Sequence, residues 1–262
     1  MIRYTIFLPS KIMIRGAGAS ISGKNYEKEL HKNLKKCMLN GKPFNTQDEN
    51  TLGGSTSNND LSCNLEGVGD IGIEAKKLTP DWMQCSIKFN TETNKWDATP
   101  NSKNPIECGK IFNELINNFN LYEGSVPPFM KRPVTHEEWK QIKKQTNLWN
   151  DTYIDIPSDT IRNLYSKKGC QYIQISNGYG LFHLGDDLCK FGVPIFDIEQ
   201  QIRVRTKIHT RKNSKGYCSL SVTAACQPKN IKQLQFSPYS LDNIVKMPPN
   251  LHYTISNSTT LL

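Results

Sequence analysis

Hydrophobic residues recur at every fourth position near the start of the chain. Tyr26, Leu30, Leu34 and Met38 follow this spacing, which places them on one face of an α-helix because the helix repeats every 3.6 residues. The opposite face of the same segment is rich in lysine. The pattern therefore predicts an amphipathic helix that begins near Gly23.

The next region has the shorter period of β-structure. LSCNL (61–65) and DIGIEAKKL (70–78) are separated by Glu66-Gly67-Val68-Gly69, whose glycines suit a tight reversal. These segments predict a β-hairpin, and QCSIKFN (84–90) predicts a third strand. Between the first helix and this hairpin, residues 45–59 are rich in Thr, Asn, Gly and Ser and predict a loop.

Helical and extended segments follow one another in the rest of the chain. Three segments predict helices by their apolar spacing: GKIFNELINNFNLY (109–122), HEEWKQIKKQTNLW (136–149) and PSDTIRNLYSKKG (157–169). The last third is predicted to be mainly β, with extended segments CQYIQIS (170–176), YGLFHLG (179–185), IRVRTKIHT (202–210) and YCSLSVTAA (217–225). The order of elements predicts an α/β protein.

The composition favours an anionic partner. Lysine and arginine number 33 against 24 aspartates and glutamates, which gives a net charge of +9. Such a balance suits contacts with phosphates, and we expect the partner to be nucleic acid, although many basic proteins bind none.

The eight cysteines are scattered singly, with no C-x-x-C pair and no histidine at zinc-finger spacing, which argues against a structural zinc site. The apolar run Ile6-Phe7-Leu8 is too short for a signal peptide, and no segment is long enough to cross a membrane. We therefore expect an intracellular protein of the cytoplasm or nucleus, with reduced thiols. The abundance of Asn, Lys and Ile would suit an AT-rich genome, such as that of a virus or a mobile element.

Acidic and basic side chains gather on one face of the predicted hairpin. On the second strand Asp70, Glu74 and Lys76 share a face, and Asp60 on the first strand lies opposite Lys76 and diagonal to Glu74. Two carboxylates and the backbone carbonyl of Ala75 would suit Mg²⁺, with Mn²⁺ as a substitute. Lys76 would orient the attacking water or stabilise charge that develops on a phosphate. A strand with one solvated polar face would explain the same triplet.

This arrangement resembles the PD-(D/E)xK nuclease superfamily, in which an aspartate begins one strand of a hairpin and E-x-K lies on the next. Here the residues are Asp60 and Glu74-Ala75-Lys76. Gly23-Lys24-Asn25-Tyr26-Glu27 is similar to the G-x-x-x-E motif on the first helix of archaeal Holliday-junction resolvases, which implies that Glu27 is a further metal ligand. Gly53-Gly54-Ser55-Thr56 is similar to their Gly-Ser loop, which implies that Ser55 contacts the phosphate.

Other positions extend or limit the resemblance, which covers roughly residues 20–90. Gln84 falls where many members have a polar residue on the next strand that steadies the lysine or the water. Asn59 stands where the family usually has proline, and Asp70 remains a rival to Asp60 as the first metal ligand.

The resemblance implies a restriction-endonuclease-like core, a central mixed sheet flanked by helices, in residues 1–130. Residues 131–262 would then form a helical and β-rich region for DNA recognition, or complete the same domain. Within this region, Arg203, Arg205 and Lys207 alternate with mostly apolar residues and would share one strand face, followed by Arg211 and Lys212. These residues could contact DNA phosphates or bases. They could equally form a solvated basic edge strand.

The function predicted from these features is hydrolysis of phosphodiester bonds in double-stranded DNA by a magnesium-dependent endonuclease. We expect a restriction-like or mobile-element enzyme, and cutting of both strands would suggest a homodimer. One alternative is a structure-selective nuclease that resembles a Holliday-junction resolvase. Another is a DNA-binding protein without catalysis, in which the carboxylates are only a polar strand face.

Overall fold

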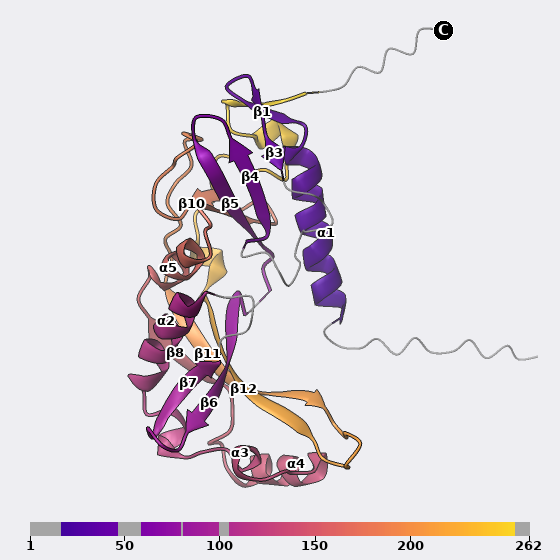
Figure 1. Cartoon of the computed structure of the whole chain (residues 1–262), viewed down its shortest axis with the longest axis vertical. Helices are drawn as coiled ribbons and strands as arrows, with labels where there is room; N and C mark the ends of the chain where they lie inside the picture. The colour runs from indigo at the N-terminus through magenta and orange to yellow at the C-terminus, as the bar shows by residue number, and fades with distance from the viewer. Residues whose placement is uncertain (1–16, 47–58, 80, 100–104, 255–262) are drawn as a thin grey trace, which may run out of the picture.

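The protein is an α/β structure with one mixed and one antiparallel five-stranded sheet. The structure is a computed structural model and describes residues 17–46, 59–79, 81–99 and 105–254. Figure 1 shows an elongated, curved molecule with one of these sheets toward each end. No helix in the described part of the chain is both long and apolar enough to cross a membrane.

The mixed sheet carries the predicted hairpin. Its strand order is β10-β9-β5-β4-β3, and only β5 and β9 run parallel to each other. The strands are β3 (Asn45–Thr46), β4 (Leu61–Leu65), β5 (Gly69–Lys76), β9 (Tyr172–Ile175) and β10 (Gly180–His183). The long helix α1 (Ala17–Leu34) packs along β5, and a small sheet of β1 (Cys37–Leu39), β2 (Lys42–Pro43) and β13 (Leu251–Tyr253) lies at its end.

The second large sheet is antiparallel throughout, in the order β7-β6-β12-β11-β8. Its strands are β6 (Met83–Asn90), β7 (Lys95–Thr99), β8 (Thr152–Ile156), β11 (Gln200–Thr210) and β12 (Ser219–Pro228). Its apolar face packs on helices α2 (Ile106–Asn117), α4 (His136–Gln145) and α5 (Thr160–Lys167), and α3 (Pro128–Lys131) lies near α4. Two 3₁₀ turns, η2 (Leu121–Gly124) and η3 (Ile231–Gln233), lie in this part, and a third, η4 (Ile244–Lys246), lies beside α1 next to the mixed sheet.

The hydrophobic residues form two clusters, one centred on each large sheet, and the cluster of the antiparallel sheet also takes in Ile173, Ile175 and Phe182 of β9 and β10. The cluster of the mixed sheet takes in Tyr26, Leu30 and Leu34 of α1, as their spacing predicts. The expectation that Met38 continues this helix face is wrong, because α1 ends at Leu34 and Met38 lies in β1. The cluster of the antiparallel sheet contains all four tryptophans of the chain. Each sheet combines strands from residues 1–130 with strands from residues 131–262, because the chain passes repeatedly between them.

The predicted hairpin is confirmed. Leu61 pairs with Ile73 and Leu65 with Gly69, and the connection uses Gly67 and Gly69 at φ of +85° and +100°. Residues with a Cβ rarely adopt such angles, so glycine suits both positions.

The third predicted strand exists but does not extend the hairpin. The segment 84–90 lies in β6, which pairs with β7 and β12 of the other sheet. The first helix also begins at Ala17 and not near Gly23. Period and composition identify an element, whereas its neighbours in a sheet depend on contacts between distant parts of the chain.

The partner of β5 on its other edge is β9, and this pairing requires Gly72. A Cβ placed on Gly72 would lie 2.2 Å from the carbonyl oxygen of Gly169. The close approach is held by Gln171, whose backbone N–H donates to the Gly72 carbonyl at 2.8 Å and whose side-chain Oε1 accepts from the Gly72 N–H at 2.6 Å. The turn between α5 and β9 therefore lies directly against β5.

Replacing Gly72 with alanine should lower the free energy of unfolding by about 1–3 kcal/mol, because the added methyl group overlaps backbone that has no room to move. The measurement is urea unfolding followed by circular dichroism. The matched control is Gly109→Ala in the interior of α2, where a new Cβ meets nothing within 4 Å. That change should stabilise the protein by about 0.5–1 kcal/mol. Equal effects of the two substitutions would contradict the close approach at Gly72.

Candidate functional site

Glu74 is an acidic side chain at the centre of the mixed sheet, with a residue exposure of only 1 %. Two lysines neutralise it. Lys76 Nζ lies 2.5 Å from Oε1, and Lys168 Nζ lies 2.9 Å from Oε2. Burial by itself raises the pKa of Glu74, but the two ammonium groups outweigh this effect and hold the pKa below its usual value. The carboxylate is therefore ionised and fully paired.

Asp60 lies just before β4 and approaches the same point. Its Oδ2 accepts a hydrogen bond from the Ala75 backbone N–H at 2.9 Å and lies 3.9 Å from Lys76 Nζ. Burial, followed by the charge of Glu74, raises the pKa of Asp60 from 3.8 to about 7. The cross-strand reach expected between Asp60, Glu74 and Lys76 is thus present.

The lysines of this group stand over an aromatic ring. Lys76 Nζ and Lys168 Nζ lie 5.3 and 5.4 Å from the centre of the Tyr165 ring, within the range of cation–π attraction. The Tyr165 hydroxyl donates to the Trp82 carbonyl at 2.9 Å, which fixes the ring. Burial lowers the pKa of Lys76 and Lys168, but the charge of Glu74 outweighs it and raises both above their usual value. Both lysines therefore remain cationic.

Lys168 and Tyr165 are the members of the group that sequence reasoning missed. Tyr165 lies in α5 and Lys168 follows directly as its C-cap residue, about one helical turn further on. Gly169 continues at a φ of +79°, the left-handed conformation that often ends a helix. The helix and its glycine are visible in the sequence, but the contact with Glu74 depends on the parallel pairing of β5 with β9. No local pattern reveals that pairing.

Glu27 faces this group from α1. Its Oε2 atom is buried and has no hydrogen-bond partner among the residues that the structure describes. Burial is the main cause that raises the pKa of Glu27, and Lys76 and Glu74 are the next strongest influences on it. A hydrogen bond of 2.7 Å from Lys77 Nζ to Ser22 Oγ ties β5 to the same helix. The expected proximity of the first helix to the carboxylates is therefore observed.

Asp70, the rival first ligand, lies at the other end of β5. Four residues along a strand correspond to about 13 Å, and Asp70 is exposed and accepts a hydrogen bond from Asn64 Nδ2 at 2.7 Å. The geometry groups Asp60, and not Asp70, with Glu74 and Lys76. The strand face that carries Glu74 is also not solvated, because the turn after α5 covers it.

Two other expected site residues are not brought to this group. Gln84 lies on β6 of the antiparallel sheet, and its side chain is exposed. The expectation that it occupies the strand next to Glu74 is wrong in placement, because β9 takes that position. Ser55 lies outside the described residues.

The basic strand β11 does present its cations on one face, but acids hold two of them. Arg203 forms ion pairs with Asp81 and Asp151, and Arg205 with Asp81. The Arg203 guanidinium also stands 5.8 Å from the centre of the Tyr153 ring. Lys207 is half-buried on the same face, and Arg211 and Lys212 are exposed where the strand ends.

The donor atoms near Glu74 are of a kind that suits a hard cation. Asp60 and Glu74 supply carboxylate oxygens, and Ala75, which directly follows Glu74, supplies a backbone carbonyl. Mg²⁺ is commonly held by one or two carboxylates and completes its shell with water and phosphate oxygens. In the described part of the chain, no group of three or more His, Cys, Asp or Glu side chains is arranged to hold a metal. Asp60 and Glu74 therefore supply the type of donor that Mg²⁺ prefers, but among the described residues no third acidic side chain is gathered with them.

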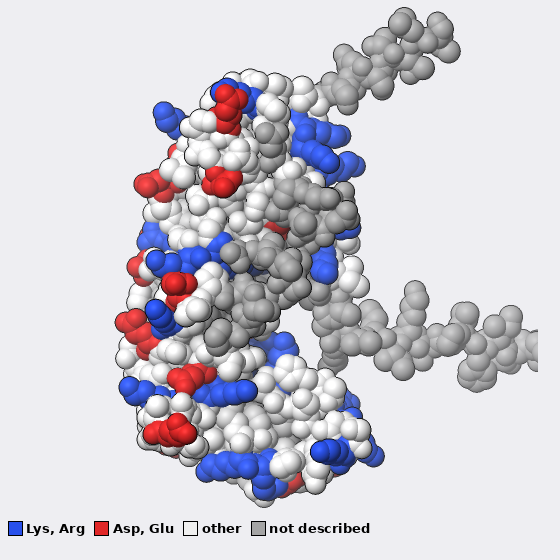
Figure 2. Space-filling view, viewed as in Figure 1, with Lys and Arg blue, Asp and Glu red and all other residues white. Residues whose placement is uncertain are grey.

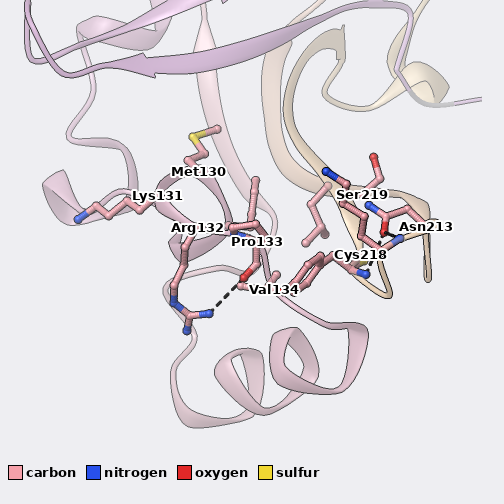
Figure 3. Close-up of a pocket in the computed structure, with 12 residues that line it drawn as sticks. Met130, Lys131, Arg132, Pro133, Val134, Asn213, Cys218 and Ser219 are labelled. Atoms are coloured by element: carbon pink, nitrogen blue, oxygen red, sulfur yellow. Dashed lines mark hydrogen bonds between the residues drawn. The ribbon is translucent and has the colours of Figure 1, made fainter.

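A pocket of about 550 Å³ adjoins this group through Lys168. Its lining includes Asn59, Asp70, Gly72 and Lys168 but not Asp60, Glu74 or Lys76. A second pocket, of about 630 Å³, lies between the residues before α4 and the β11–β12 connection (Figure 3). It contains none of the acidic residues discussed above. Its two walls are joined by the hydrogen bond from the Cys218 N–H to the Val134 carbonyl, at 2.8 Å.

All eight cysteines are buried and free of disulfides. Cys170 is the one nearest the acidic group, with its Sγ 3.7 Å from Glu74 Oε2. Burial raises the pKa of Cys170 well above its usual value, so the thiol stays neutral. It acts as a weak hydrogen-bond donor to Glu74.

Comparisons with known proteins give one remote likeness. No family model and no curated protein matches the chain. Among solved structures, the chain is similar to HhaI endonuclease in complex with DNA, with 12% sequence identity and a TM-score of 0.33. The similarity covers 81% of this chain and 91% of that chain.

The raised pKa of Asp60 predicts a pH dependence of stability. Protonated Asp60 favours the folded state, so its contribution is complete below pH 3.8 and is lost as the pH rises through about 7. The free energy of unfolding of the wild type, minus that of Asp60→Asn, should fall by roughly 2–4 kcal/mol between pH 4 and pH 8.

Urea unfolding at several pH values in the presence of EDTA measures this difference. Asp70→Asn, at an exposed aspartate of β5, is the control. The prediction fails if the difference in free energy of unfolding between wild type and Asp60→Asn stays constant with pH. It also fails if Asp70→Asn shows an equal change, because the pH dependence would then not come from the buried Asp60.

Proposed function

We propose that the protein is a metal-dependent endonuclease of the PD-(D/E)xK type, which hydrolyses phosphodiester bonds in double-stranded DNA. The observation that carries this proposal is the convergence of Asp60, Glu74 and Lys76 from two strands of a hairpin in a site that excludes most water. A polar strand face that merely met solvent would not bury an ionised glutamate between two lysines. Burial of charge is costly, which makes such groups typical of functional sites.

Asp60, Glu74 and the carbonyl oxygen of Ala75 would hold Mg²⁺, or Mn²⁺ in its place, with Glu27 as a further donor. When bound, the ion polarises the phosphate and lowers the pKa of a coordinated water. Both oxygens of Glu74 are engaged by lysines in the structure. Binding of the ion therefore requires at least one ammonium group to give up its contact with the carboxylate.

Lys76 is the residue suited to act on the phosphate. Its ammonium lies between Glu74 and Asp60. If Lys76 gives up its contact with Glu74, the ammonium therefore still lies close to both carboxylates. From there it can donate hydrogen bonds to a phosphate oxygen, or hold the attacking water in line. The Tyr165 ring limits the positions that the ammonium can take.

Lys168 gives the site a second fixed cation. It holds Glu74 Oε2, so Glu74 stays ionised and oriented even when Lys76 turns toward substrate. Lys168 also lines the adjoining pocket, where it can attract a neighbouring phosphate. We therefore assign it a positioning role within the same site.

The proposed fold class is restriction-endonuclease-like, and the leading substrate is linear duplex DNA. The half-buried Lys207 of β11 and the exposed Arg211 and Lys212 just after it are proposed to contact DNA, since Arg203 and Arg205 are engaged by acids. Cutting of both strands would require two sites, which a homodimer supplies. A second candidate is a structure-selective nuclease, which is favoured by the approach of Glu27 to the carboxylates.

The experiment is cleavage of supercoiled, linear and four-way-junction DNA by the purified protein with Mg²⁺ or with EDTA. We expect cutting only with the metal, and its loss by at least about 100-fold in Lys76→Ala and Asp60→Asn. Lys168→Ala should cut on the order of 10- to 100-fold more slowly, as expected for a residue that positions another. Circular dichroism establishes that each variant is folded.

Lys167→Ala is the matched control, because Lys167 is the exposed neighbour of Lys168 at the end of α5. It should cut like the wild type. Discrete fragments from linear DNA would support the restriction-like reading, and cutting of the junction alone would support the structure-selective one. If folded wild type cuts none of the three substrates, the protein is not a nuclease and the carboxylates serve a DNA-binding protein.

A further inference from the structure

The outer face of α1 carries a row of exposed lysines. Lys24, Lys28 and Lys32 follow one another at steps of four residues on one side of α1, and Lys35 follows three residues later, directly after the helix ends. The Lys35 N–H still donates to the His31 carbonyl at 2.9 Å, which continues the helical path. Figure 2 shows basic side chains gathered over this helix, on the right of the upper half of the molecule. We call these four residues the α1 lysine row.

The row is not neutralised by the protein. Within the described part of the chain, none of its four lysines forms an ion pair, whereas Lys42, Lys229, Arg132 and both arginines of β11 do. Residues 24–36 contain five lysines and only two glutamates. Lys76 and Glu74 influence the pKa of Glu27 more strongly than Lys24 does, and Glu29 lines the same pocket as Lys28 and Lys32.

The row also does not help the helix to form. Like charges spaced by three or four residues repel one another and destabilise a helix. The hydrophobic face of α1 supplies its packing without them, since Tyr26, Leu30 and Leu34 are buried. The row lowers the stability of the isolated helix, so an anionic partner explains it better than a role in folding does.

The position of the row connects it with the proposed site. Glu27 lies on the same helix, between Lys24 and Lys28, and Lys77 of the hairpin donates to Ser22 one turn before it. The lysines are spaced by about 6 Å along the helix, and the row spans about 17 Å. A shallow pocket of about 480 Å³ follows its second half, lined by Asn25, Lys28, Glu29, His31, Lys32, Lys35 and Lys36.

We propose that the α1 lysine row binds the phosphate backbone of duplex DNA beside the phosphate that is cut. This inference rests on the proposed nuclease function and adds the surface that holds the substrate. Arg203 and Arg205 of β11 are paired with acids, so the α1 lysine row would add its charge to that of Lys207, Arg211 and Lys212. Such contacts are independent of base sequence, because they engage phosphates only.

The test is the salt dependence of DNA binding by the full chain. A fluorescent 30-base-pair duplex is titrated in EDTA, which prevents metal-dependent cutting, at several salt concentrations. Affinity falls as salt rises, and each lost phosphate contact makes the slope of the logarithm of affinity against the logarithm of salt less negative by about 0.9. The double variant Lys28→Gln/Lys32→Gln should therefore reduce the magnitude of the slope by about 1.8, and Lys28→Arg/Lys32→Arg should retain the wild-type slope.

The matched control is Lys95→Gln/Lys110→Gln, which removes the same charge from exposed positions on β7 and α2. Its slope should equal that of the wild type. An unchanged slope for Lys28→Gln/Lys32→Gln, or an equal fall in the control, would overturn the proposal. If either result is found and the wild type cuts DNA, the α1 lysine row is excluded as the binding surface but the nuclease function stands. If the wild type neither binds nor cuts DNA, the proposed nuclease function is excluded as well.

Discussion

Glu74 is an ionised carboxylate with almost no contact with water, and much of the structure around it can be understood from this constraint. A buried charge is tolerated only when opposite charges and hydrogen bonds replace its hydration. Lys76 comes from the same strand, so one partner is local. The second partner, Lys168, comes from 94 residues further along the chain. The site therefore exists only when the hairpin and the α5–β9 turn have been brought together.

Backbone geometry makes this meeting possible. Gly72 has no side chain at the point where the Gly169 carbonyl approaches β5. Gln171 forms hydrogen bonds with both the backbone N–H and the carbonyl of Gly72. A residue chosen for close packing thus also determines where Lys168 and Tyr165 stand. Stability and the proposed chemistry share this contact, because the same turn covers Glu74 and supplies its cation.

The basic residues of the chain fall into two groups with different consequences. The arginines of β11 are bound to Asp81 and Asp151 and chiefly hold the antiparallel sheet to neighbouring segments. The lysines of α1 have no ion-pair partners in the described part of the chain and lie on the helix that carries Glu27. Net charge alone does not distinguish these groups. The distinction depends on which acids lie within reach, and it moves the proposed DNA-binding surface toward α1.

The sequence by itself determined the local elements: the amphipathic helix, the hairpin with its glycine turn, and the face shared by Glu74 and Lys76. These features follow from periods of 3.6 and 2 residues and from backbone angles that glycine accepts, and both are properties of neighbouring residues. Only the tertiary structure decided that β9 and not β6 borders β5, that Asp60 and not Asp70 joins Glu74, and that Lys168 completes the group. Those outcomes depend on contacts between residues far apart in the chain, where burial and close packing select one pairing among many.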